Sequence, residues 1–176
     1  ADSTDYFGST WMQSANNSFV NRMFAANPTI VAPGHGPTVG LSYKPKAIDF
    51  YVSGGAANAY GDTTESSFDT LDEGTLFSWG EAGWTPTFES LGKGRYTVSG
   101  WHIGEREETG QDSDWGLSAV ADQRINDTVQ VFARWGFADG DVANIQNYAQ
   151  VGAGWFPEDE ASVAAWLNKH YYHFEQ

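Results

Sequence analysis

The sequence of 176 residues contains no cysteine, which excludes disulfide bonds and thiol chemistry. Basic residues are also scarce, because nine Lys and Arg stand against 23 Asp and Glu, for a formal net charge of −14. This negative field repels the phosphates of DNA and RNA, so we expect no nucleic-acid partner. No stretch approaches the ~18 consecutive apolar residues that a membrane-spanning helix needs, so a helical span is not expected either.

Aromatic side chains and glycine, by contrast, are abundant. Aromatics make up 15% of the chain, with 8 Trp and 8 Tyr, and there are 20 Gly. The hydrophobic fraction is nevertheless 40%, and the mean hydropathy is −0.46. This combination is not typical of a helical bundle. It favours strands that present aromatic side chains to a sugar or to a membrane interface.

The pattern divides the chain into three parts within one predicted domain, residues 1–176. Residues 1–37 have the composition of loops, with a partly helical stretch that ends at Pro28. Residues 38–156 alternate between apolar and polar side chains in short runs separated by turn residues. Residues 157–176 fit a short helix or one more strand, and the pattern alone does not decide between them.

The alternating runs predict β-strands. In residues 128–140, for example, Val131 and Trp135 alternate with Gln130 and Arg134, so one face is apolar and the other is polar. Seven runs of this kind occur, at residues 38–43, 46–55, 75–84, 94–104, 115–125, 128–140 and 145–156. Regular strands of about ten residues with turns between them indicate an all-β fold built as an antiparallel meander.

Such alternation fits two kinds of protein. A soluble β-sandwich buries its apolar face and wets the other, which produces the same period of two. Two details favour a membrane barrel instead. Trp84, Trp115, Trp135 and Trp155 fall near strand ends, where outer-membrane barrels carry girdles of aromatic residues. Short turns such as "IND" also alternate with long acidic loops, as the connections of those barrels do.

Five segments, in this order along the chain, carry a resemblance to a known family: "SFVNRMFAANPTIVAPGHGPTVGLSYKP", "GTLFSWGEAGW", "GRYTVSGWHIG", "DWGLSAVADQRINDTVQVFARWGFADGD" and "YAQVGAGW". Over residues 15–156 the chain resembles the carbohydrate-selective porin family of bacterial outer membranes, the OprB type. The resemblance implies an antiparallel up-and-down β-barrel with a polar lumen that passes sugars by facilitated diffusion. It also implies that Glu81, Trp101 and Arg134 belong to the channel wall.

The chain departs from that family in length. Family members are much longer, and residues 15–156 match the middle to late part of the family barrel. The chain is therefore either a segment of a larger barrel or a shortened relative with a smaller one. A closed barrel of eight strands has an interior that side chains just fill, which would leave little room for free sugar conduction.

The polar face of the predicted strands supplies the candidate site. Carboxylates, amides and guanidinium groups suit sugar hydroxyls, and aromatic rings stack on the apolar faces of sugars. The competing interpretation is a barrel interior in which Arg and carboxylate groups merely satisfy one another. The predicted pore-lining residues are Asp49, Tyr51, Glu81, Arg95, Trp101, Gln130, Arg134, Tyr148 and Gln150, and the same face also collects Ser53, Ser118 and Asp122.

We expect neither catalysis nor a metal or other cofactor. Acidic residues are so numerous that paired carboxylates arise by chance, and nothing marks one as an acid and another as a nucleophile. His102 with Glu105, and His170 with His173, lack a complete set of metal ligands. Residues 139–144 offer loop oxygens but do not follow the EF-hand pattern.

The predicted partners are sugars and outer-membrane lipid, and the predicted location is the bacterial outer membrane. The sequence does not set the oligomeric state, for which a monomer is the simplest assumption. The alternative is a soluble, periplasmic or secreted β-sandwich that binds carbohydrate on exposed Trp and Tyr. In a porin, apolar residues such as Val131 and Val151 face lipid and Arg134 faces inward. In a sandwich the apolar set is buried and Arg134 lies on the surface.

Overall fold

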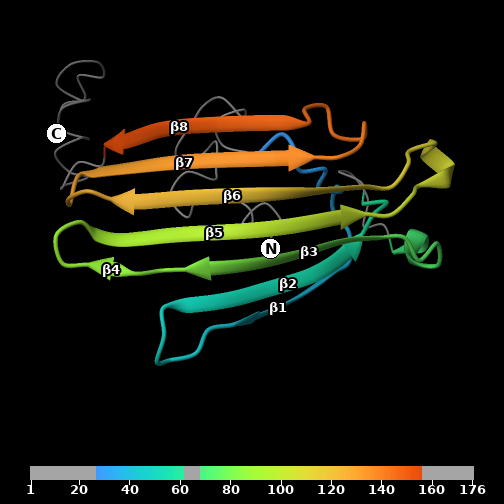
Figure 1. The fold of residues 1–176 in the computed structure, drawn as a ribbon. Helices are drawn as coiled ribbons and strands as arrows, with labels where there is room; N and C mark the ends of the chain where they lie inside the picture. The colour runs from blue at the N-terminus through green and yellow to red at the C-terminus, as the bar shows by residue number, and fades with distance from the viewer. Residues whose placement is uncertain (1–26, 62–67, 156–176) are drawn as a thin grey trace, which may run out of the picture.

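The structure of the chain is a computed structural model that describes residues 27–61 and 68–155 (Figure 1). These residues form one antiparallel sheet. Its strands are β1 (Thr38–Tyr43), β2 (Phe50–Asn58), β3 (Leu76–Trp84), β4 (Thr87–Phe88), β5 (Gly92–Ile103), β6 (Asp114–Arg124), β7 (Val129–Ala138) and β8 (Asn147–Trp155). Two 3-10 helices, Asp69–Leu71 and Glu107–Thr109, lie in loops. No helix among the described residues is long and apolar enough to cross a membrane.

Each long strand pairs with the next long strand along the chain, in the order β1-β2-β3-β5-β6-β7-β8, and β4 pairs with β5 alone. The predicted all-β, antiparallel up-and-down architecture is thereby confirmed. The edge strands β1 and β8 do not pair with each other within the described residues, so the sheet is open there. Closure into a barrel stays a prediction.

The two ends of the sheet differ in their connections (Figure 1). At one end the turns are short, and the turn at residues 125–128, for example, joins β6 to β7. At the other end the loops at 59–75, 104–113 and 139–146 are longer. We call these the short-turn end and the long-loop end. The predicted alternation of short turns with long loops is confirmed for this part of the chain.

The two faces of the sheet differ even more. We call one face inner; it carries Ser53, Glu81, Ser99, Ser118, Arg134 and Gln150. We call the other face outer; it carries Val52, Ala82, Val98, Leu117, Trp135 and Val151. Inner side chains are mostly buried, and Arg134 is 3% exposed. Outer side chains are mostly exposed, with Trp135 at 43% and Val151 at 82%. The polar face is therefore the covered one.

Aromatic rings gather at both ends of the outer face. At the short-turn end, Trp84 stacks on Phe50 at 5.9 Å, meets Phe88 edge-on at 5.9 Å and lies 5.5 Å from Tyr96. At the long-loop end, Trp115 packs edge-on against Phe137 at 5.8 Å. Between these groups the outer face carries mainly Val, Leu, Ala and Gly, apart from Trp135. The prediction of aromatic residues near strand ends is confirmed for Trp84 and Trp115.

A small apolar core fills the inner face near the long-loop end. Phe77 and Ile103 are completely buried there, and Phe77 stacks on both Trp79 and Trp101 at 6.1 Å. Ile30 and Val31 pack against this core from the segment that precedes β1. The remaining core residues are Ala57, Ala59, Ala138 and Ala143. The apolar contacts of the inner face are therefore concentrated at one end, and the polar contacts lie in the middle.

A strap formed by residues 27–31 crosses the inner face beside this core. The Asn27 amide donates to Ser118 Oγ at 3.3 Å, and Thr29 is fully buried. A side chain at Gly136 would collide with Asn27 and Thr29, so the strap rests directly on β7. The sequence predicted a loop here without predicting where it lies. The predicted helical stretch before Pro28 and the predicted helix or strand at 157–176 fall outside the described residues.

Candidate polar site on the inner face

The candidate site is a polar cluster in the middle of the inner face. Strand alternation places every second side chain on this face, and the register aligns them into rows across the sheet. One row runs through Ser53, Glu81, Ser99, Ser118 and Tyr148, and the next runs through Tyr51, Thr97, Val120, Arg134 and Gln150. Residues that are far apart in the sequence therefore become neighbours.

Glu81 lies at the centre of the best-defined part of this cluster. Its Oε1 accepts hydrogen bonds from the Tyr51 hydroxyl at 2.5 Å and from Arg95 Nη2 at 3.0 Å. Its Oε2 accepts from the Ser99 hydroxyl at 3.0 Å. Arg95 also donates to the Tyr51 oxygen, through Nε at 3.1 Å and Nη2 at 2.9 Å. Three strands are thus joined by side chains as well as by their backbones.

Glycine opposite Tyr51 makes this geometry possible. Tyr51 on β2 pairs with Gly83 on β3, and a side chain at Gly83 would collide with the Tyr51 ring. The ring therefore lies flat over β3, and its hydroxyl reaches Glu81, the previous inner residue of that strand. The same arrangement recurs where Trp79 lies over Gly55, Trp101 over Gly116 and Phe132 over Gly152. These four rings lie along the sheet because glycine faces each of them across a strand pair.

Charges alternate across the cluster. Arg95 pairs in register with Asp122, whose carboxylate attracts both Arg95 and Arg134. The Arg134 guanidinium also lies 5.3 Å from the centre of the Phe132 ring, which is a cation–π contact. From β3 to β7 the sequence of charges is Glu81, Arg95, Asp122 and Arg134. Two carboxylates and two guanidinium groups balance, so this part of the inner face has no net charge.

Amides and a phenol extend the cluster over β7 and β8. The Tyr148 hydroxyl donates to Gln150 Oε1 at 2.8 Å. Gln130 and Gln150 are 3% and 9% exposed, and both point to the inner face. An amide both donates and accepts, as sugar hydroxyls do. The predicted residues Tyr51, Glu81, Arg95, Gln130, Arg134, Tyr148 and Gln150 therefore share one face, and most of them lie in adjacent rows.

Two of the predicted site residues lie elsewhere. Asp49 is exposed in the turn before β2, and its backbone oxygen accepts from Thr85 N at 2.7 Å. The strand β2 therefore begins one residue after Asp49, and the place of Asp49 among the lining residues stays a prediction. Trp101 does point to the inner face, but it packs in the apolar core at the long-loop end.

Sequence reasoning overlooked Ser99 and Thr97 as members of the site. Both alternate with Val98 on β5 and share the inner face with Arg95 and Trp101. Period-two alternation was enough to place them on this face. The pairing of Gly83 with Tyr51 could not be found in this way, because it depends on the register between two strands.

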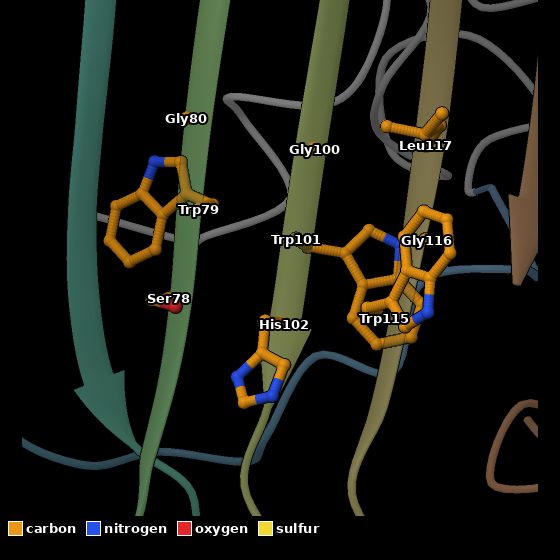
Figure 2. Close-up of a pocket in the computed structure, with 9 residues that line it drawn as sticks. All are labelled: Ser78, Trp79, Gly80, Gly100, Trp101, His102, Trp115, Gly116 and Leu117. Carbon is orange, nitrogen blue, oxygen red and sulfur yellow. The ribbon is translucent and has the colours of Figure 1, made fainter. Parts of the chain in front are cut away.

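A shallow groove of about 370 Å³ lies on the opposite side of the sheet, over β3, β5 and β6 (Figure 2). Its floor is the pair Gly80 and Gly100, and His102, Trp115 and Leu117 stand beside it. A side chain at Gly80 would meet nothing within 4 Å. The groove therefore belongs to the outer face and shares no polar contacts with the Glu81 cluster.

The long-loop end holds charged groups of a different kind. The buried Asp114 carboxylate accepts from Gly140 N at 2.8 Å and Ala143 N at 3.3 Å, which fastens the loop between β7 and β8. Burial lowers the pKa of the Arg106 guanidinium, and the nearby Tyr60 acts in the opposite direction. Among the residues that the structure describes, no group of three or more His, Asp or Glu could hold a metal ion. His170 and His173 lie outside those residues.

Comparison of the chain with protein-family models, with curated proteins and with solved structures finds no match. The resemblance to carbohydrate-selective porins therefore remains an expectation from the sequence. The polarity and burial of the two faces of the sheet are therefore the observations that bear on its function.

Proposed function

We propose that the sheet forms part of a porin-like wall in the bacterial outer membrane and that its inner face lines a passive path for sugars. The observation that carries this proposal is the arrangement of the two faces. Arg134, Asp122 and Gln130 are buried, whereas Leu41 and Val151 are each 82% exposed. A sheet that met water would bury the opposite set.

Lipid is the surrounding that suits the outer face. Contiguous apolar surface of this extent makes a water-soluble sheet prone to association. Aromatic groups at both ends of an aliphatic band match the interfacial girdles of membrane barrels. The strands from β2 to β8, apart from β4, have 9 to 12 residues, and a tilted transmembrane strand needs about 9–11.

The inner face suits an uncharged solute that is rich in hydroxyl groups. Its charges alternate and cancel, so neither cations nor anions are favoured over the whole face. Hydroxyl, amide and guanidinium groups supply both donors and acceptors, and Tyr51 and Tyr148 add rings. These are binding groups, and the proposed function is passage without chemistry. The chain's net charge of −14 therefore arises outside this cluster.

A second candidate is a soluble sheet that binds carbohydrate on the exposed rings of its outer face. The observation in its favour is that Trp84, Trp115 and Trp135 are all more than a third exposed. Most of the face around them is aliphatic or glycine, which offers a sugar few hydrogen bonds. In that alternative Arg134 would lie on the surface, whereas it is 3% exposed.

Extraction and transport separate the two candidates. The porin proposal predicts that the full chain needs detergent to remain monodisperse. It also predicts that liposomes containing the chain swell in iso-osmotic glucose faster than empty liposomes. A protein that is monodisperse without detergent, and that leaves swelling unchanged, would contradict the proposal. Binding of sugar by such a soluble form would support the second candidate.

A further inference from the structure

Most donor and acceptor positions around Glu81 are already occupied by hydrogen bonds within the cluster. An ionised carboxylate offers about four acceptor positions, and Glu81 already accepts from Tyr51, Arg95 and Ser99. The Tyr51 oxygen, in turn, is held by two nitrogens of Arg95. A solute that approached Glu81 would have to compete with all of these contacts. The most conspicuous carboxylate on the face is therefore poorly placed to recognise a ligand.

Three donors on the inner face, two beside this cluster and one in the apolar core at the long-loop end, have no such partners. Ser53 Oγ, Thr97 Oγ1 and Trp101 Nε1 are buried atoms with no hydrogen-bond partner among the residues that the structure describes. Thr97 and Trp101 are 4% and 3% exposed. A buried polar group without a partner is costly and calls for an explanation, and one that recurs in proteins is a ligand that completes it.

These donors have an ordered placement. Ser53 pairs with Glu81 across β2 and β3, and Thr97 and Trp101 flank Ser99 on β5. Along the inner face of β5, partnered and unpartnered side chains alternate from Arg95 to Trp101. Thr97 and Trp101 are separated by four residues, or roughly 13 Å along the strand. They therefore cannot contact the same hydroxyl group.

The side chains around Thr97 are less deeply buried than Thr97 itself. Arg95, the preceding inner residue, keeps 16% of its side chain exposed, and Tyr51 and Ser53 are half-buried. Gly83, which pairs with Thr97, adds no side chain of its own. A solute that reaches Arg95 therefore meets the Thr97 hydroxyl as its next polar neighbour on β5.

We propose that Thr97, Ser53 and Trp101 make the direct hydrogen bonds to a polyhydroxyl solute, and that Glu81 and Arg95 hold the surrounding wall in shape. This inference rests on the proposed function and assigns its recognition groups. Hydroxyl side chains both donate and accept, and the indole N–H donates, which matches an uncharged sugar better than an anion. Because the contact points on β5 are far apart, a disaccharide engages more of them than a single hexose.

Sugar binding by the full chain in detergent micelles tests this inference. The probes are glucose and maltose, and saturation-transfer NMR detects weak binding. Thr97→Val keeps the shape of the side chain and removes its hydroxyl. Loss of one neutral hydrogen bond predicts about five-fold weaker maltose binding. Ser53→Ala should act in the same direction. The matched control is Thr87→Val, at an exposed position on β4, and it should bind as the unaltered chain does.

The outcomes separate this inference from the proposed function. Wild-type affinity in both Thr97→Val and Ser53→Ala, with strand content unchanged by circular dichroism, would overturn the inference. If the unaltered chain binds maltose but its liposomes do not swell, the proposed passage of sugars is refuted. The Thr97→Val result still tests whether Thr97 contacts the bound sugar. If the unaltered chain binds neither sugar, both the assignment of the recognition groups and the proposal that the solute is a sugar are refuted.

Discussion

The two faces of the sheet are built from the same strands, often from adjacent residues, yet they have opposite characters. Val52 is exposed on the outer face, and the next residue, Ser53, turns inward. Val98 and Ser99 repeat the contrast on β5, where Val98 is exposed and Ser99 is buried. In the middle of the sheet, therefore, the buried side chains are the polar ones and the exposed side chains are the apolar ones.

The faces also differ in how their side chains are held. On the inner face the cluster around Glu81 is joined by directional bonds, and four rings lie over a glycine of a paired strand, namely those of Tyr51, Trp79, Trp101 and Phe132. On the outer face, Gly80 has open space above it and Val98 is exposed. Substitutions should therefore be tolerated very differently on the two sides. Three substitutions, one on the outer face and two on the inner face, test that difference.

The largest effect is expected from removing the centre of the inner face. Glu81→Ala removes the carboxylate that forms an ion pair with Arg95, which is largely buried, and that accepts from Tyr51 and Ser99. Breaking a buried pair on one side costs about 3–5 kcal/mol in the free energy of unfolding. Urea unfolding of the reconstituted chain measures this loss. Asp49→Ala, at an exposed turn, is the control and should change stability by less than about 0.5 kcal/mol. Equal effects at the two positions would refute the assigned cluster.

A charge placed on the outer face should have the next largest effect. Val98 lies between the two aromatic groups on β5, and Arg there would meet the middle of the lipid. On the lipid face of a membrane barrel, such a substitution costs about 2–4 kcal/mol at the midplane and about 0–1 kcal/mol near the interfaces. Unfolding from lipid vesicles should therefore distinguish Val98→Arg from His102→Arg, which is near the strand end. If both variants are as stable as the unaltered chain, the outer face does not meet lipid.

The strap across the inner face gives the smallest of the three effects. A methyl group at Gly136 would collide with Asn27 and Thr29, so Gly136→Ala has to displace the strap. Overpacking of this kind costs about 1–3 kcal/mol. Gly80→Ala on the outer face is the matched control and should be neutral or slightly stabilising, because nothing lies near its added methyl group. Thermal unfolding of both variants measures the difference, and a neutral Gly136→Ala would mean that the strap does not rest on β7.

Much of the architecture could be predicted from the alternation of side chains. Period two places Gln130 and Arg134 opposite Val131 and Trp135, and the structure confirms that division. Strand limits were harder, because alternation continues into the turn that contains Asp49. The short strand β4 was not predicted, since two residues are too few to show a period.

The sequence predicted which residues belong to the site better than it predicted which of them contact one another. A period of two tells which side chains share a face, so Tyr51, Glu81, Arg95 and Arg134 were assigned correctly to one side. It does not tell which residues meet across strands, because that depends on register. The pairing of Tyr51 with Gly83 determines where the phenol points. The strap over Gly136 could not be predicted either, because alternation along one strand does not show which distant segment lies over it.

The central claim is that the outer face meets lipid and the inner face meets water and solute. The absence of cysteine makes a direct measurement possible, with single spin labels at Val52→Cys and Ser53→Cys in the reconstituted chain. Power-saturation electron paramagnetic resonance then compares exposure to oxygen, which dissolves in lipid, with exposure to a water-soluble nickel complex. We predict that the label at position 52 is reached by oxygen and not by nickel, and that the label at position 53 is reached less by oxygen. A label at position 52 that nickel reaches freely would contradict the account.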